Sequence, residues 1–319
     1  MRLLILGGSG FVGRAVADEA VRRGFDVTVF NRGLRPAPAG VTVLTGDRLG
    51  DLGALGSGAW DAVVDTWSAE GDAVRRTAEL LSGRAGHYAY VSSRSVYSGE
   101  QRDRAEEAPL VDEGDDGYAG DKVRGERGAA VFDGPVLLAR AGLILGPHED
   151  VGRLPWWLNR LARGGPTLAP GPRELTLQYI DARDLATFLL DAAGRGLGGP
   201  IDLFSRAGHT TMGELLEVAN EVTGGRAELR WTDPAVIEAA GVEPWTQLPI
   251  WLPPGELHDL LHEGDVSKAY GEGLVCRPVR ETVADTWAWL RALPGEAPQR
   301  ADRPRVGLDP QVEAKLLGE

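Results

Sequence analysis

The chain has 319 residues, enough for a substantial hydrophobic core and for about two domains. Its formal net charge of −13 excludes the basic surface that nucleic-acid binding requires, so we expect a small-molecule substrate and no nucleic-acid partner. A single cysteine excludes an internal disulfide and a cysteine-based zinc site. The N-terminal residues lack the pattern of a signal peptide and no apolar run approaches about eighteen residues, so we expect a cytoplasmic protein with no membrane partner.

The first half of the chain alternates short apolar runs with amphipathic stretches. This alternation is typical of parallel βαβ units and predicts an α/β fold with a doubly wound parallel sheet of the Rossmann type. The predicted strands are Leu3–Leu6, Val27–Phe30, Val41–Leu44, Ala62–Asp65, Tyr88–Ser92 and Val136–Arg140. The predicted helices between them are Phe11–Arg23, Asp72–Leu81 and Tyr118–Phe132.

The pattern changes after Pro147, where tryptophan and proline become frequent. A strand is predicted at Leu175–Ile180. Helix and strand then alternate again, through Ala182–Ala193, Ile201–Phe204 and Met212–Thr223.

Two domains and a tail follow from this division. We predict a dinucleotide-binding Rossmann domain of residues 1–147, to which residues 176–205 return. Residues 148–175 and 206–293 are predicted to form a smaller, interleaved C-terminal substrate domain. Residues 294–319 are rich in Pro, Arg and Glu and are predicted to form an extended tail with one short terminal helix.

The first predicted strand runs into a glycine-rich loop, Gly7-Gly8-Ser9-Gly10-Phe11-Val12-Gly13. Glycine is abundant in this chain, with 44 residues, so the position of the motif gives it more weight than its composition. The loop follows a strand and opens an amphipathic helix, so its backbone N–H groups and the positive helix end would face a pyrophosphate. We predict that a dinucleotide is bound by Gly7, Gly10, Phe11, Val12 and Gly13.

The residue that selects between dinucleotides is expected at the end of the second strand, where the sequence reads Asn31-Arg32. An acidic residue there would bind the adenosine 2′-hydroxyl of NAD, whereas Arg32 can pair with the 2′-phosphate of NADP. We therefore predict NADP as the preferred cofactor and NAD as the alternative. Arg32 could also be an exposed loop charge without a ligand.

A tyrosine and a lysine lie one helical turn apart in Tyr118-Ala119-Gly120-Asp121-Lys122. The chain has three lysines against thirty-one arginines, which suggests that Lys122 serves chemistry that an arginine cannot supply. An ammonium close to a phenol favours loss of the phenol proton. Tyr118 is therefore the candidate acid and base, and an exposed helical pair is the alternative interpretation.

These motifs, together with four further segments, resemble the extended short-chain dehydrogenase/reductases, and within them the NAD-dependent epimerase/dehydratase group. The further segments are Gly46-Asp47-Arg48, Val91-Ser92-Ser93-Arg94-Ser95-Val96-Tyr97, Ala139-Arg140-Ala141-Gly142 and Gln178-Tyr179-Ile180-Asp181-Ala182-Arg183-Asp184-Leu185. All of them occur in the family's order, from Met1 to about Leu293.

The resemblance implies a catalytic set. Ser93 would hydrogen-bond the reacting oxygen, with Ser92 and Ser95 as alternatives. Tyr118 would exchange the proton. Lys122 would hold the nicotinamide ribose and assist the tyrosine.

The resemblance also implies contacts with cofactor and substrate. Asp47 would contact the adenine, Arg48 beside it is assigned to the cofactor site, and Thr66 would line the cofactor channel. The predicted substrate contacts are Trp67, Ser95, Gln178 and Tyr179. Trp156 and Trp157 are further candidates for a pocket wall, although most of the nine tryptophans are expected in the core.

The implied activity is that of an NAD(P)-dependent oxidoreductase, which transfers a hydride at a secondary alcohol or ketone of a sugar-like or nucleoside-like small molecule. One alternative is a sugar or sugar-nucleotide epimerase or dehydratase that retains its NAD. Another is a non-enzymatic relative that binds RNA or senses redox state. Family analogy also predicts a homodimer through the helices Asp72–Leu81 and Tyr118–Phe132, on whose outer faces we expect the apolar side chains of Val74, Leu81, Val123 and Val131.

Two polar features lie outside these motifs. Residues 100–121 are strongly acidic and lie between Ser93 and Tyr118, so we expect a solvated loop, with a lid over the site as the alternative.

His258 and His262 share the i,i+4 spacing of a helix, but no carboxylate lies at a known offset for a third metal ligand. We expect a solvated helix face there and no metal.

Overall fold

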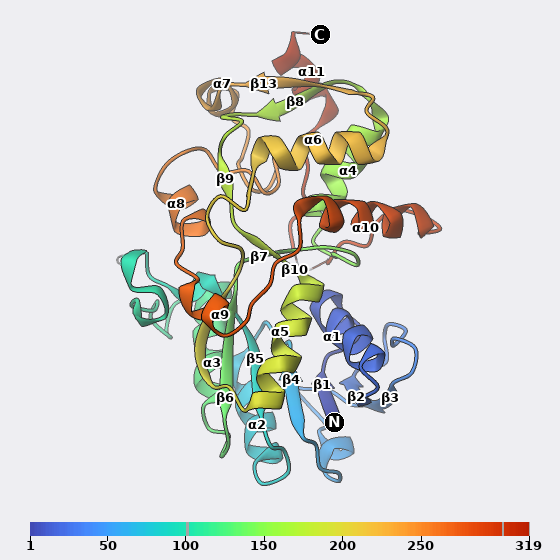
Figure 1. Ribbon diagram of the computed structural model, residues 1–319, viewed down its shortest axis with the longest axis vertical. Helices are drawn as coiled ribbons and strands as arrows, with labels where there is room; N and C mark the ends of the chain where they lie inside the picture. Colours follow the sequence, from blue (N-terminus) through green and yellow to red (C-terminus); the bar gives the residue numbers. More distant parts are fainter. Residues whose placement is uncertain (100–101, 302, 319) are drawn as a thin grey trace. The chain divides into compact units, whose positions relative to one another are not determined.

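The computed structural model describes residues 1–99, 102–301 and 303–318, and the chain folds into two compact units (Figure 1). Residues 100 and 101 of the acidic segment and residues 302 and 319 of the expected tail lie outside the described residues. Unit 1 comprises Met1–Gly142, Ala182–Phe204 and Asp265–Val275. Unit 2 comprises Leu143–Asp181, Ser205–Gly264 and Cys276–Glu319.

Unit 1 is built on a seven-stranded parallel sheet, which confirms the predicted doubly wound Rossmann fold. The strand order is β11-β6-β5-β4-β1-β2-β3. The strands are β1 (Arg2–Leu6), β2 (Asp26–Asn31), β3 (Thr42–Thr45), β4 (Ala62–Asp65), β5 (Tyr88–Ser93), β6 (Val136–Ala141) and β11 (Gly199–Leu203). Leu6 lies opposite Asp65, and Asp65 opposite Tyr90, so the carboxyl ends of neighbouring strands meet at one edge of the sheet.

Four helices of unit 1 pack in pairs. Figure 1 shows α1 (Phe11–Arg22) beside α5 (Ala182–Arg195), and these two helices are in contact. In the second pair, α2 (Gly71–Leu81) packs against α3 (Tyr118–Ala129). Shorter helical segments of this unit are η1 (Gly53–Leu55), η2 (Arg94–Val96), η3 (Arg102–Glu107) and α9 (Ser267–Gly271).

The pair α2 and α3 buries most of the apolar side chains that the sequence analysis places on its outer faces. Val74 and Leu81 are fully buried, and Val123 is buried as well. Only Val131 of these four is exposed, at 39 %. The expectation of an apolar outer face is therefore wrong for three of the four residues, because they pack inside unit 1.

Unit 2 contains short strands and six α-helices among its described residues. The strands are β7 (Leu143–Leu145), β8 (Gly165–Pro170), β9 (Thr176–Leu177), β10 (Tyr179–Asp181), β12 (Thr210–Thr211) and β13 (Ala227–Thr232), which pair as β7–β10, β8–β13 and β9–β12. The helices are α4 (Arg153–Arg163), α6 (Met212–Thr223), α7 (Pro234–Ala239), α8 (Glu256–His262), α10 (Val279–Ala292) and α11 (Pro310–Leu317). Within the described ranges, no helix of either unit is long and apolar enough to cross a membrane.

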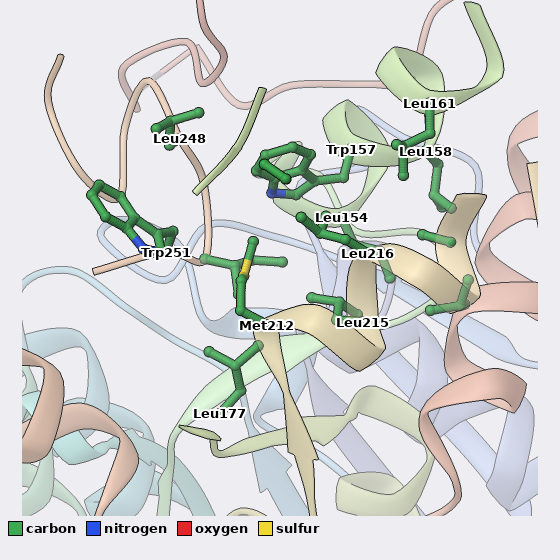
Figure 2. Packing of buried hydrophobic residues seen from close by; sticks show 14 of the residues in the cluster. Leu154, Trp157, Leu158, Leu161, Leu177, Met212, Leu215, Leu216, Leu248 and Trp251 are labelled. Carbon is green, nitrogen blue, oxygen red and sulfur yellow. The ribbon is translucent and has the colours of Figure 1, made fainter. Parts of the chain in front are cut away.

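The core of unit 2 forms where α4 packs against α6 (Figure 2). Helically spaced apolar side chains of the two helices meet there, namely Leu154, Trp157, Leu158, Leu161, Met212, Leu215 and Leu216. Trp157 is fully buried, and its Nε1 donates to the carbonyl of Pro249 at 2.7 Å. It is a core residue and not a pocket wall.

The short terminal helix expected after Leu293 is present as α11, and it packs against β8. Glu313 of α11 is buried, and its two carboxylate oxygens accept from Arg160 Nε at 2.7 and 2.9 Å. Glu313 Oε1 also accepts from the backbone N–H of Leu168 at 3.1 Å. At least one charged side chain of this polar segment, Glu313, therefore forms a buried ion pair inside unit 2 and is not solvated.

Candidate functional site

The glycine loop turns sharply between β1 and α1. Gly7 has φ +124°, a value that a side chain rarely adopts, and a Cβ there would lie 2.3 Å from Thr66 Oγ1. A Cβ on Gly13 would lie 2.6 Å from the backbone N of Gly8, so only glycine lets α1 approach the loop this closely. A Cβ on Gly10, the N-cap of α1, would meet no described atom within 4 Å. Open space in front of a helix N-terminus fits a dinucleotide pyrophosphate.

The predicted cofactor residues beside this loop lie at the ends of β1, β2 and β3. Phe11 and Val12 form the first turn of α1. The amide of Asn31 ties β2 to the glycine loop, because Nδ2 donates to the Gly7 carbonyl at 3.4 Å and Oδ1 accepts from the backbone N–H two residues on at 2.8 Å. Arg32 is exposed immediately after β2, and the exposed Asp47 follows β3.

Arg48 is buried, and its guanidinium binds Asp65. Nη1 donates to Oδ1 and Nη2 to Oδ2, both at 2.8 Å, and Nη2 also donates to Thr77 Oγ1 at 2.9 Å. Burial, the largest single cause, would lower the pKa of Arg48, but the charge and the hydrogen bonds of Asp65 together raise that pKa above its ordinary value. Burial would likewise raise the pKa of Asp65, but Arg48 reverses the effect and lowers it, so both groups remain ionised. These contacts lie inside unit 1, whereas the resemblance implies a contact with the cofactor.

Thr66 and Trp67 follow Asp65 at the end of β4. Thr66 Oγ1 donates to the carbonyl of the last residue of β1 at 3.0 Å. The backbone N–H of Trp67 donates to Asp65 Oδ1 at 2.9 Å, and its indole Nε1 donates to a backbone carbonyl three residues on at 3.0 Å. The guanidinium carbon of Arg48 lies 5.2 Å from the centroid of the Trp67 ring. Both the backbone and the ring of Trp67 are thus held within unit 1.

Lys122 is 2 % exposed, which excludes the alternative of an exposed helical pair. Its Nζ donates to the carbonyl of Trp67 and to that of Val91, both at 2.7 Å. The same atom lies 4.8 Å from the ring centroid of Tyr90 and 5.8 Å from that of Tyr118. The ammonium therefore lies against the carboxyl ends of β4 and β5 and faces two aromatic rings, which attract a cation.

The three candidate serines at the end of β5 have different partners. Ser92 Oγ donates to Glu126 Oε1 of α3 at 2.6 Å and is occupied by that bond. Ser93 Oγ accepts from the backbone N–H of Ser95 at 3.1 Å and donates to Ser95 Oγ at 3.2 Å. Helix α3, which begins at Tyr118, packs against both β5 and η2. This arrangement favours Ser93 over Ser92 as a partner of Tyr118.

A buried ionic network that the sequence motifs do not indicate contacts one of these serines through Glu126. Arg140 donates through Nε and Nη2 to the two carboxylate oxygens of Glu126, at 2.9 and 2.8 Å, and through Nη1 to Tyr97 OH at 3.0 Å. Tyr97 OH donates to Asp202 Oδ1 at 2.8 Å. Burial is the main cause that raises the pKa of Asp202 to about 7. The sequence does carry a signal for this network, because Arg140 and Asp202 each lie in a predicted apolar strand, and a charged residue there needs a buried partner.

The acidic segment is anchored in its described part. Glu106 Oε1 accepts from the backbone N–H of Asp202 at 3.0 Å, and the Glu106 carbonyl accepts from Arg140 Nη1 at 3.1 Å. Further along, the backbone N–H of Val111 donates to the carbonyl of Val96 at 2.8 Å. Residues 112–117 are exposed, as expected for a solvated loop.

Gln178 and Tyr179 lie in unit 2 and are buried. Gln178 Nε2 donates to the carbonyls of Ser205 and Gly264, at 3.0 and 2.9 Å, and its Oε1 accepts from the N–H of Gly264 at 2.7 Å. The Tyr179 ring lies 5.6 Å from that of His209. These contacts give both side chains structural roles within unit 2.

The expectation that His258 and His262 form a solvated helix face is wrong, because both are buried. His258 Nε2 lies 2.9 Å from the carbonyl of Thr176, and His262 Nδ1 accepts from the backbone N–H of Gln178 at 3.0 Å. In the part of the chain that the structure describes, no group of three or more His, Cys, Asp or Glu side chains could hold a metal ion.

Known proteins resemble this chain in fold more than in sequence. No curated protein matches the chain in sequence. A putative epimerase from Burkholderia cenocepacia is 20 % identical over 92 % of this chain and 98 % of its own, with a TM-score of 0.67. The NAD-dependent NDP-hexosamine 5,6-dehydratase TunA of tunicamycin biosynthesis is 19 % identical over 92 % and 98 %, with a TM-score of 0.68. The UDP-glucose 4-epimerase of Thermus thermophilus, in complex with NAD, is 19 % identical over 92 % and 99 %, with a TM-score of 0.65.

At these identities the solved structures share the fold of this chain. Residues 3–200, more than half of the chain, match the NAD dependent epimerase/dehydratase family. The chain therefore belongs to the NAD dependent epimerase/dehydratase family, a family of enzymes.

Proposed function

We propose that this chain is an NAD(P)-dependent oxidoreductase that acts at a secondary alcohol or ketone of a sugar-like or nucleoside-like small molecule. The observation that carries the proposal is the buried ammonium of Lys122, held by two carbonyls at 5.8 Å from the ring of Tyr118. A buried charge is costly, so its place beside a tyrosine at the carboxyl edge of the sheet favours a chemical role.

The chain's own residues would divide the reaction as follows. Ser93 would donate a hydrogen bond to the reacting oxygen of the substrate, and Tyr118 would take or return that oxygen's proton. Lys122 would stabilise the phenolate of Tyr118 and bind the nicotinamide ribose. The glycine loop would hold the pyrophosphate. A bound nicotinamide dinucleotide would supply hydride transfer.

NADP is proposed as the preferred cofactor because Arg32 is exposed at the end of β2, beside the glycine loop. The neighbouring Asn31 amide is used by the loop itself and carries no charge that would repel a phosphate. The solved Thermus thermophilus epimerase is a complex with NAD, so the relatives do not support NADP. The proposed preference for NADP therefore rests on Arg32 alone.

A second candidate is an epimerase or dehydratase that retains its NAD and returns the hydride to the same molecule. The family name and the sugar-nucleotide enzymes among the solved relatives favour it. Both candidates use the same proton and hydride step, so the residue roles above apply to either. Substrate contacts of Trp67, Ser95, Gln178 and Tyr179 stay a prediction in both cases.

A turnover assay separates these candidates. The purified protein is incubated with oxidised or reduced NAD and NADP and with a panel of free sugars, nucleotide-linked sugars and nucleosides. A net oxidoreductase changes the nicotinamide absorbance in step with product, whereas an enzyme that retains its cofactor forms product with no such change. Cofactor binding without conversion of any compound would favour the non-enzymatic alternative.

The glycine loop is tested with a matched pair of variants. Gly10→Ala adds a methyl group into open space, so the thermal midpoint should stay close to that of the wild type while affinity for cofactor falls at least about tenfold, since the methyl blocks the pyrophosphate. Gly271→Ala adds a methyl group in equally open space of α9 and should change neither quantity. Full cofactor affinity of Gly10→Ala would contradict the assignment of the loop.

The homodimer through α2 and α3 rests mainly on family analogy, because three of the four apolar side chains expected on the outer faces are buried inside unit 1. The surface of these helices instead carries a cleft lined by charged side chains, including Asp72, Arg75, Arg124 and Arg127. A dimer formed there would depend on ion pairs and should weaken with salt. A monomer mass in light scattering at micromolar concentration and low salt would contradict it.

A further inference from the structure

We propose that the buried Arg48–Asp65 ion pair positions Lys122, because it holds the backbone N–H and the ring of Trp67, the residue whose carbonyl accepts from the Lys122 ammonium. The inference rests on the proposed function and deepens it, since it names residues that place one of the groups used for proton exchange. Arg48 and Asp65 do not touch reacting atoms in this scheme. They are positioning residues.

The first step is the turn after β4. Asp65 ends that strand, and its Oδ1 accepts from the backbone N–H of Trp67 at 2.9 Å. A side chain that binds the N–H two residues on fixes the intervening backbone as an Asx turn. The carbonyl of the same residue, Trp67, accepts from Lys122 Nζ at 2.7 Å. Trp67 thus connects the Asp65 carboxylate to the Lys122 ammonium through its own N–H and C=O groups.

The second step explains why this carbonyl needs a side-chain constraint. The other acceptor of Lys122 is the carbonyl of Val91, and Val91 lies inside β5, opposite Ala139 of β6. The sheet ladder fixes its orientation. Trp67 lies beyond the last residue of β4, so the ladder does not fix its carbonyl. Asp65 holds the N–H of Trp67 and Arg48 faces its ring, and together these contacts limit how far the residue can turn.

The third step is the fixing of Asp65 itself. Two parallel hydrogen bonds from Arg48, both 2.8 Å long, set the plane of the carboxylate, and Tyr88 OH donates to Oδ2 at 2.5 Å. Arg48 also faces the ring of Trp67, with its guanidinium carbon 5.2 Å from the centroid. The ion pair therefore touches Trp67 twice, through its backbone and through its side chain.

Stability alone is a poor explanation for this pair. Arg48 is 6 % exposed and Asp65 is 0 % exposed, and the loss of hydration at such burial offsets most of the attraction between the charges. An apolar pair could fill the same space, but it could not accept a hydrogen bond from Trp67. The turn also carries Thr66, which lies against Gly7, so the pair connects the glycine loop to Lys122.

The test exploits the three lysines of the chain, whose ammonium signals can be resolved by NMR after isotopic labelling of lysine. Single Lys→Arg substitutions at Lys268 and Lys315 assign the other two signals. The readouts are the chemical shift of the Lys122 ammonium and the rate at which its protons exchange with water. Neither needs cofactor or substrate, so this experiment can fail while the proposed function holds, and it can succeed while that function fails.

The decisive variant is Arg48→Met/Asp65→Leu, which removes both charges together with the acceptor for Trp67. The Lys122 signal should shift and its protons should exchange about tenfold faster, because the Trp67 carbonyl is no longer held in place. Arg48→Met/Asp65→Asn keeps a side-chain oxygen for Trp67 and should restore most of the wild-type behaviour. This rescue would not occur if the pair served stability alone.

The control is Arg160→Met/Glu313→Leu, which removes a buried ion pair of unit 2 and should leave the Lys122 signal unchanged. If Arg48→Met/Asp65→Leu does not fold, Arg48→Gln keeps Asp65 and weakens its fixation, and it should give a smaller change of the same sign at Lys122. A folded variant of either kind with an unchanged Lys122 signal overturns the proposal. An equal change in the unit 2 control also overturns it.

Discussion

A buried ammonium is unusual in a chain that uses arginine for thirty-one of its thirty-four lysine and arginine residues. Lys122 donates from one nitrogen atom to two carbonyls at 2.7 Å, and a compact point charge satisfies this arrangement. A guanidinium spreads its charge over a planar fork and would need acceptors further apart. At the scale of the single residue, the structure therefore gives a physical reason for lysine at this position.

The proton-transfer roles lead to the first prediction. Tyr118→Phe should lower turnover by about 10²–10⁴ and leave cofactor affinity nearly unchanged, because it removes a hydroxyl remote from the pyrophosphate. Lys122→Ala should reduce both turnover and cofactor affinity. Lys122→Arg should reduce them as well, despite its conserved charge. Steady-state kinetics and cofactor titration measure these effects. Lys268→Arg, at an exposed lysine of α9, is the control. Turnover of Tyr118→Phe within about threefold of the wild type would disprove the assignment of Tyr118.

The second prediction concerns Arg32. NADP should bind more tightly than NAD, and Arg32→Ala should remove most of the difference, since a hydrogen bond to a charged group contributes about 1.5–3 kcal/mol. The corresponding loss is about tenfold to a hundredfold in NADP affinity, with NAD affinity unchanged. Titration of both cofactors measures it, and Arg35→Ala, three residues on, is the control. Equal or tighter binding of NAD by the unmutated protein would refute the preference.

At the scale of elements, the hydrophobic pattern of the sequence predicts those strands and helices whose bounds are set by interactions between residues close in the chain. The strand at Ala62–Asp65 and the helix at Met212–Thr223 are observed with their predicted bounds. The predicted strand Leu175–Ile180 is instead interrupted at Gln178, because that residue gives its backbone N–H to His262, 84 positions away in the sequence. No local pattern contains such a partner.

The same limit applies to the candidate site. The sequence places Ser93, Tyr118 and Lys122 on elements that the fold brings to one edge of the sheet, because strand order follows from the βαβ pattern. It cannot show that Ser92 is occupied by Glu126 or that Arg48 pairs with Asp65, since these contacts depend on how helices pack on the sheet. The roles of neighbouring residues in one motif are therefore separated only by the tertiary structure.

The docking of α11 leads to the third prediction. Glu313→Ala leaves the buried Arg160 guanidinium without its carboxylate and should lower the free energy of unfolding by about 3–5 kcal/mol. Glu221→Ala breaks the exposed ion pair with Arg280 and should cost less than about 1 kcal/mol. Chemical denaturation of both variants measures the contrast. Similar small losses in the two variants would show that α11 is held weakly and that the segment behaves as the tail expected from its composition.

For the whole molecule, the formal net charge of −13 counts every Asp and Glu side chain as ionised. Two buried carboxyl groups lose their protons less readily than this count assumes. Glu149 is fully buried, and its oxygens accept from the backbone N–H groups of Arg153 and Leu154 at the start of α4. Burial is the main cause that raises the pKa of Glu149 to about 7. The pKa of Asp202 in unit 1 is raised to about 7 in the same way.

The fourth prediction is the resulting dependence of stability on pH. A carboxyl whose folded pKa lies above its ordinary value of 4.5 stabilises the fold below that pH and loses this contribution as pH rises toward 7. Over this range the contribution of Glu149 should fall by up to about 3 kcal/mol, at about 1.4 kcal/mol per pKa unit. Glu149→Gln cannot ionise, so relative to the wild type it should gain stability between about pH 5 and pH 8.

Denaturation of both proteins across this pH range measures the change in their difference, which does not depend on how well the amide fits. Glu296→Gln, at an exposed position, is the control and should show no such change with pH. A constant difference between wild type and Glu149→Gln would contradict a raised pKa at Glu149. The opposite slope would show that the helix N-terminus outweighs the loss of hydration.

The ion pair between Arg160 and Glu313 joins residues 153 positions apart. During synthesis on the ribosome, α4 therefore emerges with a cation whose buried partner has not yet been made. Unit 2 also draws its chain from three separate stretches, between which the segments of unit 1 are synthesised. Until the third stretch, Cys276–Glu319, has been synthesised, the core of unit 2 is incomplete, and incompletely folded chains with exposed apolar surface are prone to aggregation. The order in which its residues are synthesised, as well as the strength of its contacts, therefore bears on when unit 2 can complete its core.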